Sequence, residues 1–286
     1  MSEQSYKIII RGPRDSLEIS PDSPCRLVEG GLSGFDCAGF DVKLRSYAAD
    51  AGGYAEKRRF AERELSLTFA VDREASDSVR RQLISMLDPA DDLTLDVTLY
   101  GERRVIPVIP YDQPEFSRPT FSHPLEVTLT FVAPTVFFRE AEPRTVVFRD
   151  GAGMLTFPLN LMRGAGTVAG MFRVRGAATV TNPGDGPCGV TVRVRASGGS
   201  VECPKISVGT QWIRCPFTLE AGEELVIDTN PRHKTIEVDG VRSFQFDRDS
   251  TFFSLPRGDA AVSVSADEGE EFMEAEIEFT PIYFGM

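Results

Sequence analysis

The stretch from Arg58 to Tyr111 alternates apolar and polar residues in three runs, with one run of helical spacing between the first two. Alternation puts every second side chain on one face, which is typical of a half-buried strand. Gly101 lies where a tight hairpin turn between the second and third runs is needed. The pattern predicts strands over Leu65–Val71, Leu93–Leu99 and Val105–Ile109.

The segment between the first two strands carries apolar residues at i, i+4, i+7 and i+8, which share one face of a helix. These residues are Val79, Leu83, Met86 and Leu87. Ser76 is a candidate N-cap, Asp77 places negative charge in the first turn, and Pro89 ends the helix. A sheet with one helix lying across it is the simplest arrangement. Whether the strand-helix-strand connection joins parallel strands stays open at this point.

Further strands are predicted on both sides of this stretch. They are Ser5–Ile10 paired with Ser16–Ile19 around Gly12-Pro13, Phe40–Arg45 with Phe40, Val42 and Leu44 on one face, and Leu125–Phe131. The segment Ser46–Lys57 is predicted to be a loop or the tip of a long hairpin. Segments of this kind commonly contact another molecule.

From Ala133 to about Met171 the chain becomes irregular and rich in Gly, Pro, Phe and Arg, which indicates a domain join. We therefore expect an N-terminal domain over 1–140, a linker over 141–170 and a C-terminal domain over 171–286. Short strands separated by turn residues predict a two-sheet sandwich of the jelly-roll kind in the last of these. The predicted strands are Ala178–Val180, Val190–Val194, Lys205–Val208, Trp212–Phe217, Glu224–Asp228, Thr235–Val238, Ser243–Phe246, Phe252–Leu255, Val262–Ala266 and Ala275–Phe279.

Composition agrees with a mainly β globular chain and limits its partners. The 286 residues are 41% hydrophobic and carry a formal charge of -12, so the molecule as a whole repels nucleic acid and anionic lipid. We expect neither a nucleic acid nor a membrane as partner. One cluster of cations interleaved with carboxylates is predicted to form a solvated or interface charge network: Lys57, Arg58, Arg59 and Arg63 with Glu56, Glu62 and Glu64.

The five cysteines form no CxxC pair and leave an odd number, which argues against a disulfide framework and against a zinc site. Free thiols in a reducing compartment fit better. The first residues, Met1 to Tyr6, are polar, and no run of about eighteen apolar residues occurs. We therefore expect synthesis in soluble form in the cytoplasm.

Catalytic residues are hard to assemble from this sequence. Only His123 and His233 supply imidazoles, they lie far apart along the chain, and neither belongs to an HxxxH or HExxH motif. The acidic pairs Asp91-Asp92, Glu223-Glu224 and Glu270-Glu271 fall in predicted turns. We expect no enzyme activity, no cofactor and no metal. The single tryptophan, Trp212, is interpreted as a core or rim residue, with a stacking platform for sugar as the alternative.

Several motifs of the C-terminal half occur in an order that resembles one family, the distal tail protein (Dit) of long-tailed bacteriophages and prophages. These motifs are Val180-Thr181-Asn182-Pro183-Gly184, Leu219 to Asp228, Val238-Asp239-Gly240, Phe252 to Gly258, and Ile277 to Tyr283 ahead of Gly285. The strand-helix-strand-hairpin unit of the N-terminal half adds to the resemblance. One turn, Pro256 to Ala260, departs from the Pro-Gly-Asn-like turn common in the family.

The resemblance implies a structural protein of the virion tail tip or baseplate, made in the cytoplasm of the host. An N-terminal belt domain, a β-sheet or sandwich with one α-helix, would form a homo-hexameric ring between the tail tube and the tail hub, and DNA would pass through it. A galectin-like C-terminal β-sandwich would point outward. The implied partners are further copies of the chain, the tail tube protein, the hub or tail-associated protein, and receptor-binding or side-fibre proteins.

The segment Ser46–Arg59 is the predicted subunit contact, through Tyr47, Tyr54, Arg58 and Arg59, because Arg and Tyr bury area while keeping polar groups available. A ring of such contacts would cover strand edges and close on itself. The alternative function is a carbohydrate-binding β-sandwich or adhesin on a cell or virion surface. A hydrolase is the third.

Overall fold

The computed structural model describes residues 6–48, 50–117, 124–149, 173–174 and 177–286. The chain divides into two compact units, Met1–Ala141 with Tyr283–Met286, and Glu142–Ile282, each with its own hydrophobic core. The second unit begins before residue 171, because β12 (Arg144–Arg149), inside the predicted linker, pairs with a strand near the end of this unit. The fold class is confirmed: the described chain is mainly β, with one α-helix in the first unit.

The main sheet of the first unit has the strand order β2-β1-β7-β8-β10-β6-β3. Three shorter strands join it, β9 on β10, β11 on β8, and β25 on β11. The strands predicted at Leu65, Leu93, Val105 and Leu125 are confirmed. Tyr100 and Gly101, both with positive φ, make the turn between β7 and β8. The bounds are β1 (Lys7–Arg11), β2 (Ser16–Ile19), β3 (Cys25–Ser33), β6 (Arg63–Val71), β7 (Leu93–Leu99), β8 (Glu102–Pro110), β9 (Glu115–Phe116), β10 (Leu125–Ala133), β11 (Phe138–Glu140) and β25 (Ile282–Tyr283).

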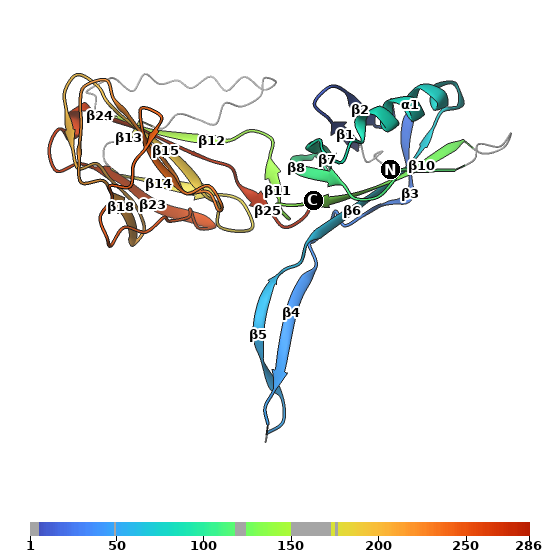
Figure 1. Cartoon of the computed structure of the whole chain (residues 1–286), viewed down its shortest axis with the longest axis horizontal. Helices are drawn as coiled ribbons and strands as arrows, with labels where there is room; N and C mark the ends of the chain where they lie inside the picture. Colours follow the sequence, from blue (N-terminus) through green and yellow to red (C-terminus); the bar gives the residue numbers. More distant parts are fainter. Residues whose placement is uncertain (1–5, 49, 118–123, 150–172, 175–176) are drawn as a thin grey trace. The chain divides into compact units, whose positions relative to one another are not determined.

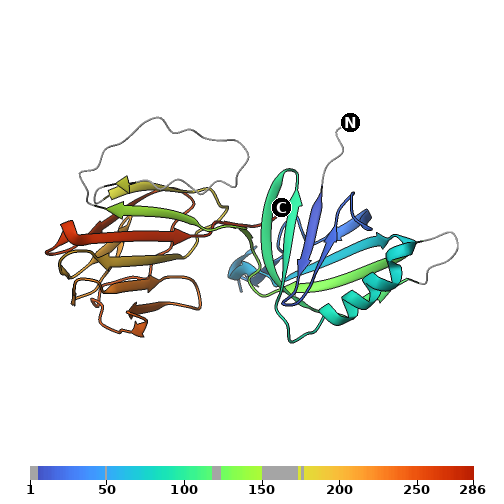
Figure 2. The ribbon, with the colours of Figure 1, turned by 90° about the horizontal axis from the view of Figure 1, so that it is seen from above.

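The helix α1 (Ser76–Met86) follows a short 3-10 turn, η1 (Arg73–Ala75), and lies beside the strands of this sheet (Figure 2). Val79, Leu83 and Met86 are buried, as the spacing predicted. The prediction of Ser76 as N-cap is wrong: Ala75 is the cap residue and Ser76 starts the helix, with its hydroxyl donating to the Asp72 carbonyl. The chain already turns helically in η1, so the helix needs no separate cap. β10 and β8 lie between β6 and β7, so the helix does not connect neighbouring strands.

A separate two-stranded sheet leaves the first unit between β3 and β6. β4 (Phe40–Ser46) and β5 (Gly53–Phe60) pair with each other and with no other described strand (Figure 1). Of the two structures considered for Ser46–Lys57, the tip of a long hairpin is the one observed. Gly52, with φ +91°, lies in the turn, and its carbonyl accepts a hydrogen bond from the Tyr47 amide at 3.1 Å. We call β4 and β5 with their connecting turn the hairpin arm.

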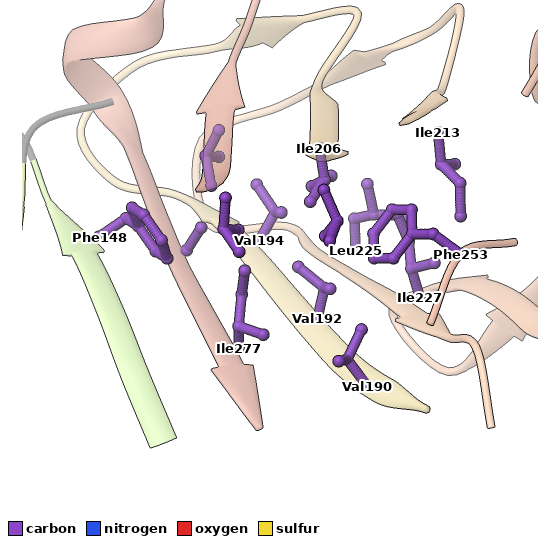
Figure 3. Packing of buried hydrophobic residues seen from close by; sticks show 14 of the residues in the cluster. Phe148, Val190, Val192, Val194, Ile206, Ile213, Leu225, Ile227, Phe253 and Ile277 are labelled. Atoms are coloured by element: carbon purple, nitrogen blue, oxygen red, sulfur yellow. The ribbon is translucent and has the colours of Figure 1, made fainter. Parts of the chain in front are cut away.

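The second unit is a sandwich of a seven-stranded sheet, β13-β12-β24-β15-β20-β21-β22, and a four-stranded sheet, β14-β23-β17-β18, with a pair β16-β19. Figure 3 shows the apolar side chains, Val192 and Ile206 among them, that fill the space between strands of the two sheets. The bounds are β13 (Arg173–Val174), β14 (Ala177–Asn182), β15 (Val190–Ala196), β16 (Val201–Glu202), β17 (Lys205–Val208), β18 (Gln211–Arg214), β19 (Thr218–Leu219), β20 (Glu224–Asp228), β21 (Thr235–Val238), β22 (Val241–Arg242), β23 (Gly258–Ser265) and β24 (Met273–Phe279), with η2 at Glu270–Phe272.

Two of the strands predicted in this unit are not formed. Ser243–Phe246 is irregular, and Phe244 is 84% exposed, so no neighbouring sheet fixes the segment. Phe252–Leu255 is also irregular apart from one bridge, in which Leu255 and Cys188 exchange backbone hydrogen bonds of 2.8 and 3.0 Å. Phe253 and Leu255 are buried there although no strand ladder forms. The other eight predicted strands overlap observed ones.

All five cysteines are free thiols. Within the described residues, no three side chains of the His, Cys, Asp and Glu types come together as a metal would require. None of the described helices has the length and apolar character to cross a membrane.

Candidate subunit interface

One face of the hairpin arm is apolar and open to solvent. Alternation along β4 brings Phe40, Val42 and Leu44 to the same side, and they are 70%, 53% and 72% exposed. On β5, Phe60 lies opposite Phe40, with ring centroids 5.6 Å apart, and Arg58 lies opposite Val42. Exposed apolar side chains gathered on one face are typical of a contact surface.

The opposite face of the arm is charged and paired internally. The Asp41 carboxylate binds the ammonium of Lys57 at 2.9 Å and the guanidinium of Arg59 at 2.7 Å, and these hydrogen bonds, Lys57 first, hold the pKa of Asp41 below its usual value. A second network, centred on Glu56, joins Lys43 at 3.1 Å and Arg45 at 2.8 Å. Only Lys57, Arg59 and Glu56 of the predicted charge network take part in these ion pairs. Their partners Asp41, Lys43 and Arg45 were not part of the prediction, which is therefore wrong in most of its members.

A β-bulge explains how Glu56 joins this network. Lys43 pairs with Lys57 and the next residue, Leu44, pairs with Ala55, so that Glu56 is the extra residue of β5. An extra residue shifts the alternation of its strand by one position. The shift turns Glu56 toward Lys43 and Arg45 instead of toward Leu44, and the apolar face keeps no carboxylate.

The four predicted contact residues divide between the two faces. Tyr47 and Tyr54 are each 50% exposed and lie against each other near the tip, with ring centroids 5.8 Å apart and the ring planes tilted by 40°. Arg59 belongs to the charged network, whereas Arg58 lies on the apolar side and makes no ion pair that the described residues show. Sequence reasoning passed over Phe40, Val42 and Leu44, because alternating apolar residues in a strand normally indicate a face buried in the same chain.

Arg63 does not belong to the solvated network in which the sequence placed it. It opens β6, is 1% exposed, and has its guanidinium carbon 4.9 Å from the centroid of the Phe138 ring. Burial lowers the pKa of Arg63, because a charged group loses hydration there. Its Nη2 donates to the Phe284 carbonyl, while Nε and Nη1 are buried without a partner in the described structure.

The remaining candidates lie apart from the arm. Trp212, in β18, is half-buried, and the ammonium of Lys205 lies 4.7 Å from the centroid of its ring system, so one face of the indole is occupied. His233 binds Asp228 through Nδ1 at 2.9 Å and is otherwise exposed, with no nucleophile among the hydrogen-bond partners of its side chain. His123 lies outside the described residues.

Comparison with known proteins places the second unit in a family. Residues 183–283 match the model of the siphovirus-type tail component, C-terminal domain. These residues belong to that family. The recognition of a distal tail protein from its C-terminal motifs is thereby confirmed, since this domain contains most of them.

Solved structures share the fold over almost the whole chain. The crystal structure of SPP1 Dit, described as a paradigm of the hub adsorption apparatus in phages that infect Gram-positive bacteria, matches with a TM-score of 0.67 and 14% identity, over 96% of this chain and 98% of that one. A chain of the phage P2 baseplate, in its activated conformation with Ca, matches with a TM-score of 0.50 and 9% identity, over 98% of each chain. A search of curated proteins gave no match. At these identities the two structures establish the fold of both units of this tail component.

Proposed function

We propose that this tail component is a structural protein of the phage tail tip, which forms a homo-hexameric ring between the tail tube and the hub. The observation that carries the proposal is the apolar face of the hairpin arm, which no element among the described residues of its own unit covers. The family match of the second unit supports the location in a virion tail, after synthesis in the cytoplasm of the host.

A second copy of the chain is the proposed occupant of the apolar face. A two-stranded hairpin is marginally stable by itself in water, and neither outer edge of this one pairs with another strand in the described part of the chain. In a closed ring of identical subunits, each arm lies on its neighbour and each neighbour presents the same receiving surface. All arms are then covered, and no surface remains free to add further copies.

The chemistry of the contact follows from the two faces. Burying Phe40, Val42 and Leu44 contributes about 1.5–3 kcal/mol for each side chain that becomes fully covered. Arg58, on the same side, would meet a carboxylate or carbonyl of the neighbour, since a buried guanidinium needs acceptors. The charged side, with its own ion pairs satisfied, would stay toward solvent.

The other partners follow from position in the tail. The first unit would line the ring, and the net charge of -12 suits a channel whose wall must not bind the phosphates of passing DNA. The tail tube protein on one side and the hub or tail-associated protein on the other would contact the ring. The second unit, proposed to be galectin-like, would face outward toward receptor-binding or side-fibre proteins.

The experiment is the mass of the purified protein in solution, measured by light scattering over a range of concentrations. We expect a species of six copies for the natural chain and a monomer for the double variant Phe40→Ser with Leu44→Ser. The control is Val241→Ser, which removes an apolar side chain that is 70% exposed in the second unit, and which should leave the hexamer intact. A natural chain that stays monomeric at every concentration, and binds glycans on an array, would refute the ring and favour the carbohydrate-binding alternative.

A further inference from the structure

The last four residues of the chain, Tyr283–Met286, lie in the first unit, more than 140 positions after the rest of it. Tyr283 and Met286 pack against the core of that unit, and β25, which includes Tyr283, pairs with β11. We call Tyr283–Met286 the returning segment. The first unit binds both its backbone, through hydrogen bonds, and its side chains, through ring and cation contacts, in the way that a protein binds a peptide ligand.

The backbone of the returning segment is bound at three consecutive residues. Arg63 donates to the carbonyl of Phe284, Arg104 donates to the carbonyl of Gly285, and the amide of Met286 donates to the Phe35 carbonyl at 3.0 Å. The two arginines come from β6 and β8, which are separate strands of the main sheet. Three directed hydrogen bonds fix both the position and the direction of the bound backbone.

The side chains occupy aromatic and charged surroundings. The Phe284 ring lies against Phe60, at 4.8 Å between centroids, and against Phe137, at 5.3 Å. The guanidinium carbon of Arg104 lies 3.9 Å from the centroid of the Tyr283 ring. The hydroxyl of Tyr283 donates to Glu140 at 2.9 Å. Contacts of this kind stabilise a bound segment beyond the area that they bury.

Gly285 makes the site selective. A Cβ atom built on this buried residue would lie 1.3 Å from the carbonyl oxygen of Asp36, which is far inside van der Waals contact. The obstacle is backbone, so no side-chain rotation can relieve it. The site therefore admits glycine and excludes every residue with a side chain at this position.

Arg63 links the returning segment to the root of the hairpin arm. The arm ends at Phe60, which holds the Phe284 ring, and β6 begins at Arg63, which holds the Phe284 carbonyl. The segment supplies the acceptor to a guanidinium whose Nε and Nη1 have none in the described structure. Loss of the segment would leave a buried cation without that acceptor, which is costly in an apolar environment.

We propose that the first unit carries a sequence-selective binding site for the peptide Tyr-Phe-Gly-Met, filled by Tyr283–Met286, and that the occupied site holds the root of the hairpin arm in place. The site itself stands on the contacts of the first unit and does not depend on the hexamer. Only its consequence for assembly, through the arm, rests on the proposed function.

The test is hydrogen-deuterium exchange of the full chain, read by mass spectrometry in peptides that cover the returning segment and residues 33–39. Gly285→Ala is expected to speed exchange in the returning segment at least tenfold and to raise exchange at the root of the arm, around Phe60. The matched control is Gly39→Ala, close to the same root, where a Cβ would lie 3.6 Å from the Ala61 Cβ and no strain arises. This control should exchange as the natural chain does.

A second variant, Phe284→Ala, keeps the backbone bonds and removes the ring, so a smaller increase is expected in the same peptides. Unchanged protection of the returning segment in Gly285→Ala would overturn the proposal. The two proposals fail separately: Val42→Ser with Leu44→Ser should abolish the hexamer and leave the returning segment protected, because these residues lie opposite Arg58 and Ala55 and not opposite Phe60. Release of the segment in that double variant would also count against the site.

Discussion

Strands β4 and β6 have the same alternation of apolar and polar residues, but the apolar side chains of β6 are buried and those of β4 are exposed. In β6, Leu65, Leu67 and Phe69 are 0% exposed, because β10 and β3 flank the strand and the core covers its face. In β4, Phe40 and Leu44 are 70% and 72% exposed, since β5 is the sole partner of this strand among the described strands. The same pattern thus stabilises the fold in one place and remains available for a partner in the other.

The difference teaches that alternation predicts a strand with an apolar face and does not say which molecule covers that face. For β6 the cover is the chain itself, and the hydrophobic contribution appears in the folding free energy. For β4 the same contribution would appear in the free energy of association. The same substitution made in β6 and in β4 therefore distinguishes a loss of folding stability from a loss of association.

The largest expected effect is in β6. Leu67→Ala should lower the free energy of unfolding by about 2–5 kcal/mol, because it leaves a cavity among fully buried neighbours. Leu44→Ala, the matched change in β4, should alter the unfolding of the monomer by no more than about 0.5 kcal/mol and should weaken the hexamer. Denaturant unfolding at low concentration, followed by light scattering at high concentration, measures both. Equal losses of stability in the two variants would remove the distinction between the strands.

The next effect contrasts buried and exposed ion pairs. Asp96 in β7 is 3% exposed and binds Arg103 at 2.7 Å and Arg11 at 2.9 Å. Hydrogen bonds from Arg103, and then from Arg11, hold the pKa of Asp96 below its usual value, against the effect of burial. A depressed pKa in the folded state adds stability above the unfolded pKa, near 4. That stability is lost as the pH falls through the lower, folded value.

Asp96→Asn should therefore cost about 1 kcal/mol at pH 7, discounted because both arginines are half exposed, and the cost should shrink toward zero in strong acid. Asp41→Asn, in the exposed network of the arm, is expected to leave the unfolding curve unchanged at both pH values. Urea unfolding at pH 7 and pH 3 compares them. A deficit in Asp96→Asn that stays the same at the two pH values would contradict the role of its charge.

The smallest expected effect concerns Tyr54, near the tip of the arm, and Arg58, on its apolar face. Tyr54→Ala with Arg58→Ala should raise the concentration at which the hexamer dissociates, by less than Phe40→Ser with Leu44→Ser does. The reason is that Arg58 lies on the apolar face and Tyr54 on the charged face, so this variant removes one side chain of the proposed contact and the other variant removes two. Sedimentation of both double variants at graded concentrations gives the order. If the Tyr54 and Arg58 variant assembles as the natural chain does, the contact is confined to the apolar face.

The spacing of apolar residues along the sequence was sufficient to predict most of the secondary structure. The strands at Leu65, Leu93 and Leu125 and the buried face of α1 follow from spacing alone, since the positions of side chains around a strand or helix are set by the backbone. The turn at Gly101 follows from the need for positive φ. In the second unit, turn residues between short apolar runs located eight strands for the same reason.

Contacts between residues distant in the chain decided what spacing left open. Whether an apolar face is covered depends on neighbours far along the sequence, so Phe40 and Leu67 look alike until the sheets assemble. The burial of Arg63 depends on Phe138 and on Phe284, 221 positions away. Periodicity acts over a few residues, whereas these environments come from tertiary packing. The apolar arm and the site for the returning segment were therefore visible only in the folded chain.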